Sequence, residues 1–178
     1  ILEVYNKYPI SQLIVHPRTR EQLYKGTPNM EAFKYALENS KNPVCYNGDI
    51  NTVENYHRII EKINNDSEMK IESIMIGRGL IGNPNLVNEI KGGKKLTKKM
   101  LEAYHDRLYN DFEKIMKADK HLLFKMKEMW TYMSLNFDDS HKCAKLIRKA
   151  QNLYKYNLAV YEIFEEYRYH GFWYCLLQ

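Results

Sequence analysis

The stretch Ile71-Glu72-Ser73-Ile74-Met75-Ile76-Gly77-Arg78-Gly79 decides the fold class, because an apolar, strand-like run ends directly in a glycine loop. The same order occurs about one strand-helix unit earlier, in Pro43-Val44-Cys45-Tyr46-Asn47-Gly48-Asp49. A third apolar run, residues 12–15, precedes His16-Pro17-Arg18-Thr19-Arg20. The pattern predicts three consecutive strand-helix units of an α/β fold, as in a (β/α)₈ TIM barrel, where the loops after the strands form the functional face.

The two glycine loops predict a site for a phosphate group. Glycine permits a positive φ and lets the backbone approach a ligand closely, and the Arg78 guanidinium can pair with a phosphate oxygen. Asn47, Gly48, Asp49 and Gly77 complete the candidate anion site. In (β/α)₈ barrels the loops after the last two strands frequently bind phosphate.

The charge is divided unevenly along the chain. Residues 1–90 carry 10 Lys and Arg against 11 Asp and Glu, whereas residues 91–178 carry 17 against 11. Between the halves, Lys91-Gly92-Gly93-Lys94-Lys95 interrupts the periodic pattern. We therefore expect a barrel portion over 1–93, a basic helical domain over 94–170 and an unassigned tail over 171–178.

Beyond that boundary the chain predicts four helices with short connections, the pattern of an antiparallel bundle. Thr97 and Asn157 are the expected N-caps of the first and fourth helices, and the third begins near Ser140, after Asp138-Asp139. The expected core positions are Met100, Tyr104, Leu108, Phe112 and Ile115, then Leu122, Met126, Met129, Trp130, Met133 and Phe137, then Leu146 and Ile147, and finally Leu158, Tyr161 and Phe164. Such a Met and aromatic stripe indicates a packed core rather than a cofactor site.

The third helix carries the strongest basic pattern. Lys142, Lys145, Arg148 and Lys149 fall at spacings that place them along one face, and such a face can follow a phosphate backbone. A second basic region consists of Lys114, Lys117, Lys120, Lys125 and Lys127. An ordinary solvated lysine surface explains both patterns equally well from the sequence alone.

The cysteines and the hydropathy restrict the other classes of function. Cys45 lies inside an expected buried strand, where a thiol acts as a small apolar side chain. No spacing of Cys and His is typical of zinc, so we expect no metal site. No apolar run reaches the length of a membrane span, and three unpatterned cysteines favour a reducing, cytoplasmic compartment.

In order and spacing, these motifs resemble the second half of a tRNA-dihydrouridine synthase. The resemblance extends from about residue 10 to about residue 165 and rests on the His16 to Arg20 motif, on Asn47-Gly48-Asp49-Ile50, on Met75-Ile76-Gly77-Arg78-Gly79-Leu80-Ile81-Gly82-Asn83-Pro84 and on the helical tail. It implies FMN as cofactor, NADPH as reductant, tRNA as partner, and reduction of the C5–C6 double bond of uridine.

The resemblance also implies roles for individual residues. Asn47, Gly48, Asp49, Gly77 and Arg78 would hold the phosphate and ribityl chain of FMN. His16 would contact the flavin ring, and Arg18 would face the extruded uridine. The C-terminal helical domain would dock tRNA through Lys142, Lys145, Arg148 and Lys149.

The same resemblance predicts that this chain is a fragment. Its first strand would correspond to strand six of the barrel, and the family's catalytic cysteine and flavin-contacting lysine would lie before Ile1. We therefore expect no catalytic residue here, no activity of the fragment alone, and an open barrel edge covered by the N-terminal half or by another chain. The apolar stretch Phe172-Trp173-Tyr174-Cys175-Leu176-Leu177 has no counterpart in the family.

Two other classes of function fit parts of the pattern. A flavin-dependent barrel oxidoreductase acting on a small molecule would share the glycine loops but would not need a basic bundle. In a non-catalytic RNA-binding module, the glycine loops would be ordinary turns.

Overall fold

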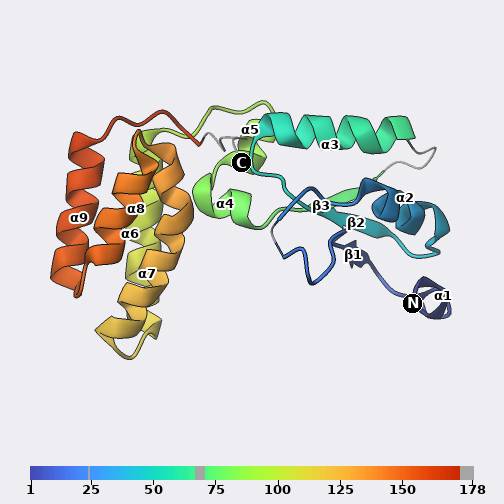
Figure 1. Ribbon diagram of the computed structural model, residues 1–178, viewed down its shortest axis with the longest axis horizontal. Coiled ribbons are helices and arrows are strands. Elements are labelled where there is room, and N and C mark those ends of the chain that lie inside the picture. Colours follow the sequence, from blue (N-terminus) through green and yellow to red (C-terminus); the bar gives the residue numbers. More distant parts are fainter. Residues whose placement is uncertain (24, 67–70, 173–178) are drawn as a thin grey trace. The chain divides into compact units, whose positions relative to one another are not determined.

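The computed structural model describes residues 1–23, 25–66 and 71–172, and the chain divides into two compact units, Ile1–Gly77 and Arg78–Gln178. The first unit contains the strands and the second is helical (Figure 1). The elements of the first unit are α1 (Leu2–Tyr5), β1 (Leu13–Val15), α2 (Met30–Asn39), β2 (Val44–Asn47), α3 (Val53–Asp66) and β3 (Ser73–Met75).

The predicted parallel strands are confirmed. They form a three-stranded sheet in the order β1-β2-β3, with Leu13 paired to Val44 and Cys45 paired to Ser73. The central strand β2 is buried, and the ring of its Tyr46 meets Phe33 of α2 edge to face at 4.9 Å. The carboxyl ends of all three strands therefore lie along one edge of the sheet.

The second unit begins at α4 (Arg78–Gly82) and α5 (Leu86–Ile90), before the Gly92-Gly93 pair at which we expected the boundary. The difference has a packing reason. Helix α4 contacts the bundle, and the buried Asn136 amide donates from Nδ2 to the Gly82 carbonyl oxygen over 2.9 Å. Helix α4 therefore packs with the helices that follow it.

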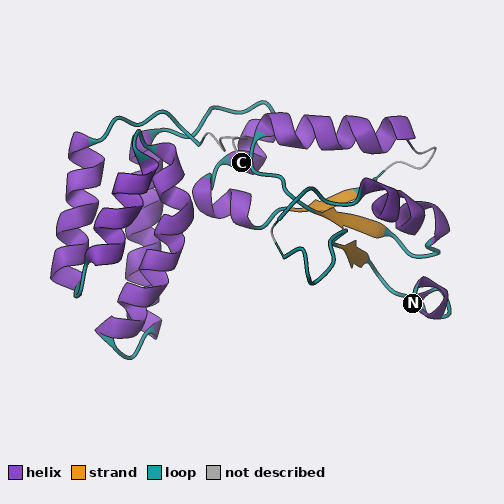
Figure 2. Ribbon diagram, viewed as in Figure 1, coloured by secondary structure: helices purple, strands orange, loops and turns teal. Residues whose placement is uncertain are grey.

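The bundle contains α6 (Lys98–Ile115), α7 (Asp119–Met133), the 3₁₀ turn η1 (Ser134–Asn136), α8 (Ser140–Lys149) and α9 (Leu153–Glu166) (Figure 2). Consecutive members of α6 to α9 pack against each other. The predicted N-cap of α6 is confirmed, since the Thr97 side chain accepts from the Met100 amide. Asp139 caps α8 in the same way, by accepting from Lys142.

The predicted start of the fourth helix is wrong. Asn152, not Asn157, accepts from the Lys155 amide and caps α9, so the N-cap lies five residues earlier than expected. The buried side chains of α9 consequently include Tyr156 and Ile163, whereas Leu158 and Tyr161 are exposed. Asn157 lies inside the helix, where its backbone N–H already has a helical partner.

The core of the bundle is aromatic and Met-rich, as the periodicity predicted. It includes Met126, Met133, Trp130, Phe137 and Phe164, all buried. Two expected core positions, Met100 and Ile115 of α6, are instead exposed. Helix α7 also ends before Phe137, which pairs with Tyr169 in an isolated antiparallel bridge after the 3₁₀ turn.

The remaining expectations concern cysteines, metals, membranes and the tail. Cys45 and Cys143 are buried free thiols. Within the described ranges, no cluster of His, Cys, Asp or Glu is arranged to hold a metal ion, and no helix has the length and apolarity required to span a bilayer. The tail beyond Phe172 lies outside the described residues. Phe172 itself packs on Gly82, because a Cβ there would lie 2.0 Å from the ring.

Candidate functional site

A chain of hydrogen bonds links the carboxyl ends of the three strands. His16, directly after β1, donates from Nδ1 to the carbonyl oxygen of Asn47 over 2.6 Å. The Asn47 side chain, at the end of β2, donates to the carbonyl oxygen of Met75 in β3 over 3.0 Å. Because a carbonyl only accepts, Nδ1 of His16 carries the proton. The exposed His16 therefore has a fixed ring orientation, with Nε2 remaining for another partner.

Arg18 and Asp49 form the main electrostatic contact of this edge. The Arg18 guanidinium donates through both terminal nitrogens to the two carboxylate oxygens of Asp49, one of them over 2.9 Å. Arg18 also donates to the Gly26 carbonyl. The Arg18 side chain is 1% exposed and that of Asp49 is 31% exposed. The negative charge of Asp49 is thus balanced by an arginine from the preceding strand end.

The two loop glycines, Gly48 and Gly77, differ in what surrounds them. Neither Gly48 nor Gly77 has a positive φ, so neither position uses the left-handed conformation that glycine permits. At Gly48 a Cβ would lie 2.1 Å from the Tyr46 hydroxyl oxygen, so glycine is required by packing within the chain. At Gly77 a Cβ would meet no atom of the described residues within 4 Å, so the surface that these residues leave beside its backbone is open.

Tyr46 is a residue of this edge that the sequence pattern did not single out. Its side chain is fully buried, and its hydroxyl has no hydrogen-bond partner among the described residues. Burial, reinforced by the nearby Asp49 charge, raises the pKa of Tyr46 to about 12. Tyr46 is therefore a neutral phenol packed beneath the Asn47-Gly48-Asp49 loop.

The expected cofactor-binding residues fall in both units. His16, Asn47, Gly48, Asp49 and Gly77 belong to the strand ends of the first unit. Arg78 is the first residue of α4 and belongs to the second unit. Among the predicted site residues, direct hydrogen bonds join His16 to Asn47 and Arg18 to Asp49.

The basic residues of α8 lie on its exposed side. Lys142, Lys145, Arg148 and Lys149 are all exposed, whereas Ile147 is buried. The Lys142 ammonium lies 5.2 Å from the centre of the Tyr167 ring. The neighbouring Tyr167 side chain raises the pKa of Lys142 above its ordinary value. All four side chains are exposed and therefore accessible to an anionic partner.

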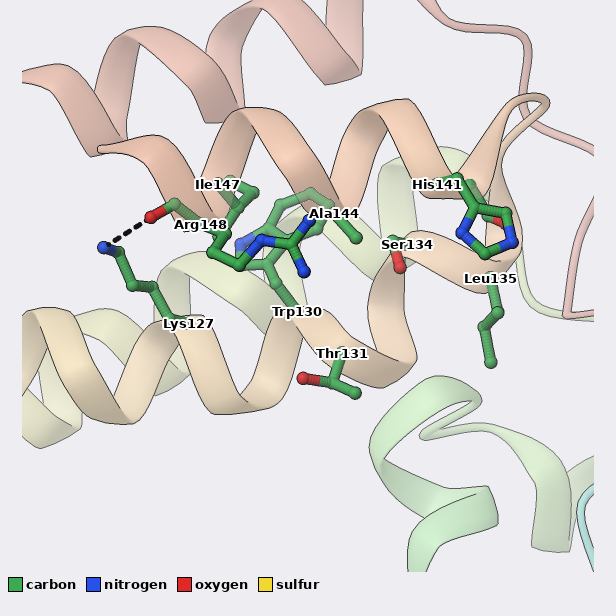
Figure 3. A pocket seen from close by; sticks show the side chains of 10 residues that line it. Lys127, Trp130, Thr131, Ser134, Leu135, His141, Ala144, Ile147 and Arg148 are labelled. Carbon is green, nitrogen blue, oxygen red and sulfur yellow. Dashed lines mark hydrogen bonds between the residues drawn. The ribbon is translucent and has the colours of Figure 1, made fainter.

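Most lysines of the second basic region interact with other groups of the protein. Lys127 of α7 donates to the carbonyl oxygens of Arg148, over 3.0 Å, and Ala150, and thereby caps the carboxyl end of α8 (Figure 3). Lys125 pairs with Glu128 and Lys114 with Asp111, over 2.9 Å and 3.1 Å. In Figure 3, Lys127 and Arg148 stand at one end of a groove of about 340 Å³ between α7 and α8.

Phe124 is a second feature that sequence reasoning missed. It is 74% exposed, although Leu122 and Leu123 immediately before it are buried. A signal was present, because three consecutive apolar residues cannot all face the core of an amphipathic helix. The sequence did not indicate which of them faces outward.

Comparisons with known proteins give a consistent result. The sequence model of the family described as dihydrouridine synthase (Dus) matches residues 4–166. The chain is 31% identical over 137 residues to tRNA-dihydrouridine synthase B of Shewanella oneidensis, an alignment that covers 68% of this chain and 40% of that protein. It is 29% identical over 120 residues to a probable tRNA-dihydrouridine synthase of Rickettsia bellii, covering 65% of this chain and 35% of that protein.

A third relative is the tRNA-dihydrouridine(16) synthase of Pseudomonas syringae. It is 36% identical over 85 residues, which are 48% of this chain and 25% of that protein. The chain thus spans well under half the length of the curated relatives it matches.

Proposed function

The chain belongs to the dihydrouridine synthase family, and from this membership we propose that it is part of an enzyme that reduces the C5–C6 double bond of a uridine in tRNA. The proposed cofactor is FMN and the proposed reductant is NADPH. The observation that carries the proposal is the family match over residues 4–166, which includes both the strand ends and the basic bundle. Since tRNA is the proposed substrate, we assign the enzyme to the cytoplasm.

We propose that the first unit supplies the last strands of a (β/α)₈ barrel. Three parallel strands in sequential order are the arrangement that such a portion requires. Apolar residues on the two outer strands support this, since Ile14 of β1 is 55% exposed and Met75 of β3 is 46% exposed. In the complete protein, further strands from its remaining part or from another chain would cover them.

We assign the FMN phosphate and ribityl chain to the strand ends. The open surface beside Gly77 supports close approach of a ligand to the backbone, and the fixed orientation of His16 leaves its Nε2 available for cofactor contact. Asn47, Gly48 and Asp49 would form the neighbouring wall, and Arg78, which follows Gly77 in the chain, would add positive charge. When bound, FMN supplies the hydride chemistry, for which the protein provides orientation and exclusion of water.

The role of Arg18 follows from its buried ion pair. The terminal nitrogens of Arg18 already donate to Asp49 and Gly26. Arg18 would therefore position the Asn47-Gly48-Asp49 loop and would influence the uridine indirectly, through the residues that it contacts. The group that protonates C5 is assigned to the part of the enzyme outside this chain. We place no catalytic residue among the 178 residues.

The helical unit is the proposed tRNA-holding part. The exposed cations of α8 would contact phosphates, because structured RNA presents its backbone and shape more readily than its base edges. A separate holding surface is needed, since a uridine inside folded tRNA must leave its stack before reduction.

The test uses the complete protein that contains this chain, incubated with FMN, NADPH and an unmodified tRNA transcript. Mass spectrometry of the digested RNA should detect one uridine that has gained two hydrogen atoms, and omission of NADPH is the control. If FMN is bound and the tRNA is intact but no uridine changes mass, a small-molecule flavoenzyme replaces this proposal.

A further inference from the structure

The start of α7, the end of α8 and the start of α9 lie at the same end of the bundle (Figure 1). Residues of these three segments line a second groove. Its volume is about 770 Å³, within the size range of ligand-binding clefts. Apolar contact surface comes from Leu123, Phe124 and Leu153, and positive charge from Lys120, Arg148 and Lys149. We call it the Phe124 groove.

We propose that the Phe124 groove binds one unpaired nucleotide of the tRNA, with its base stacked on the Phe124 ring and its flanking phosphates held by the neighbouring cations. The inference rests on the proposed function, because it specifies how the helical unit would hold RNA beyond backbone contact.

The first argument is the exposure of the ring. Phe124 is 74% exposed on a helix whose other large apolar residues, such as Leu123 and Met126, are buried, so the ring does not serve the core. An aromatic face open to solvent is the platform on which unpaired bases stack, and it accepts any base because each has a π-face.

The second argument is charge. Four cationic side chains, those of Lys120, Lys127, Arg148 and Lys149, line the groove together with one carboxylate, that of Asp119. Among the residues that the structure describes, no ion pair engages the side chains of Lys120, Arg148 or Lys149. Lys127 also lines the groove, but its ammonium caps α8 and so contributes to the shape of the wall. This balance favours an anionic occupant over an apolar peptide or a second protein copy.

Tyr161 is a matched control, because its ring is also exposed but its surroundings are acidic. It is 68% exposed on α9, but the groove beside it is lined by the carboxylates of Glu102, Asp106 and Glu165. A phosphate backbone would be repelled there. Exposure of an aromatic ring is therefore shared by both residues, and only Phe124 combines it with positive charge.

The test measures tRNA affinity of the complete protein by fluorescence anisotropy, with an unmodified tRNA transcript. Phe124→Ala should weaken binding about 5- to 150-fold, the range for loss of one stacked base. Phe124→Trp should retain affinity and Phe124→Leu should not, because leucine is apolar but offers no π-face. Tyr161→Ala should bind as the wild type does. Since the Phe124 ring is exposed, the thermal midpoint should not change with these substitutions.

Three outcomes would overturn the inference. If Phe124→Ala binds tRNA with wild-type affinity, the groove does not bind a nucleotide. If Phe124→Leu retains full affinity, the base does not stack on the ring. If Phe124→Ala changes the sedimented mass of the protein but not its RNA affinity, the groove contacts a protein instead. Charge reversal of Lys142 and Lys145, two α8 lysines that do not line the groove, separates the two proposals. If it weakens binding while Phe124→Ala does not, only the groove assignment fails. If it has no effect, the tRNA-holding role of this α8 face fails.

Discussion

The Arg18 guanidinium and the Asp49 carboxylate form a two-point ion pair between residues 31 positions apart in the chain. The pair connects the loop after β1 to the loop after β2, and the Arg18 side chain is almost completely buried. Two loops that the sequence presents separately are thereby held as one unit at the edge of the sheet.

Removing one partner of this pair should destabilise the first unit. Asp49→Ala should lower the free energy of unfolding by about 3 kcal/mol, the low end for breaking a buried pair, because the Asp49 carboxylate is itself partly exposed. Urea unfolding measures the change. Glu38→Ala is the control in the same unit, since the exposed Lys34–Glu38 pair of α2 at 4.0 Å should be worth about 0.3–0.5 kcal/mol. Equal losses in both variants would mean that the Arg18–Asp49 pair carries no special weight.

The two loop glycines should respond oppositely to alanine. Gly48→Ala should destabilise by about 1–3 kcal/mol, because the new methyl group overlaps the Tyr46 side chain. Gly77→Ala should leave stability unchanged, since a Cβ there would meet no atom of the described part of the chain within 4 Å. In the complete enzyme, Gly77→Ala should instead weaken FMN binding, which flavin fluorescence measures. Normal FMN affinity of a stable Gly77→Ala protein would contradict the assignment of this loop to the cofactor.

A buried histidine should make the stability of the bundle pH-dependent. His105 accepts from the Tyr156 hydroxyl at Nε2 over 2.7 Å, and its Nδ1 donates to Asp106 over 2.9 Å. Burial lowers the pKa of His105 in the fold, although Asp106 and Glu102 oppose this. Below about pH 6.5 the unfolded chain therefore binds a proton that the folded chain excludes. The stabilisation is fully present above that pH and is lost as the pH falls towards the lowered pKa.

Unfolding midpoints between about pH 5 and pH 8 measure this dependence around the ordinary pKa of histidine. His105→Gln should flatten the slope below pH 6.5, at some cost in stability. His121→Gln, at an exposed position of α7, should keep the wild-type slope. An unchanged slope in His105→Gln would assign the dependence to other groups.

The capping lysine should matter for folding and not for RNA. Lys127→Met removes a charged donor from the carboxyl end of α8 and should cost about 1.5–3 kcal/mol, measured by thermal or urea unfolding. Lys125→Met, two positions earlier, loses only a surface pair with Glu128 and should cost less than about 1 kcal/mol. The salt dependence of tRNA binding should be the same in both variants. A reduced slope in Lys127→Met would show that Lys127 contacts phosphate.

Charge reversal on α8 should weaken tRNA binding in a salt-dependent way. In Lys145→Glu/Lys149→Glu, each lost phosphate contact should reduce the slope of log affinity against log salt by about 0.7–0.9. Anisotropy titrations at several salt concentrations measure it. The double variant Lys114→Glu/Lys125→Glu is the control, since both lysines are already paired with carboxylates. Equal effects of the two double variants would mean that binding follows net charge rather than the α8 face.

Local sequence signals predicted the elements more reliably than their surroundings. The apolar runs before Asn47 and Gly77 predicted β2 and β3, and Thr97 predicted the start of α6, because strand patterns and N-caps depend on neighbouring residues. The N-cap of α9 was predicted wrongly because Asn152 and Asn157 are equally good local signals, and packing of Tyr156 into the core selects the first.

By itself, the amino-acid sequence determined the parallel strand-helix units, the helical bundle, the basic second half and the order of motifs that places the chain in its family. Only the tertiary structure decided how the charged and aromatic side chains are used. It joins Arg18 to Asp49, directs Lys127 to the end of α8 and leaves Phe124 in solvent. The physical reason is that periodicity and capping act over a few residues, whereas ion pairing and burial depend on which distant segments pack together.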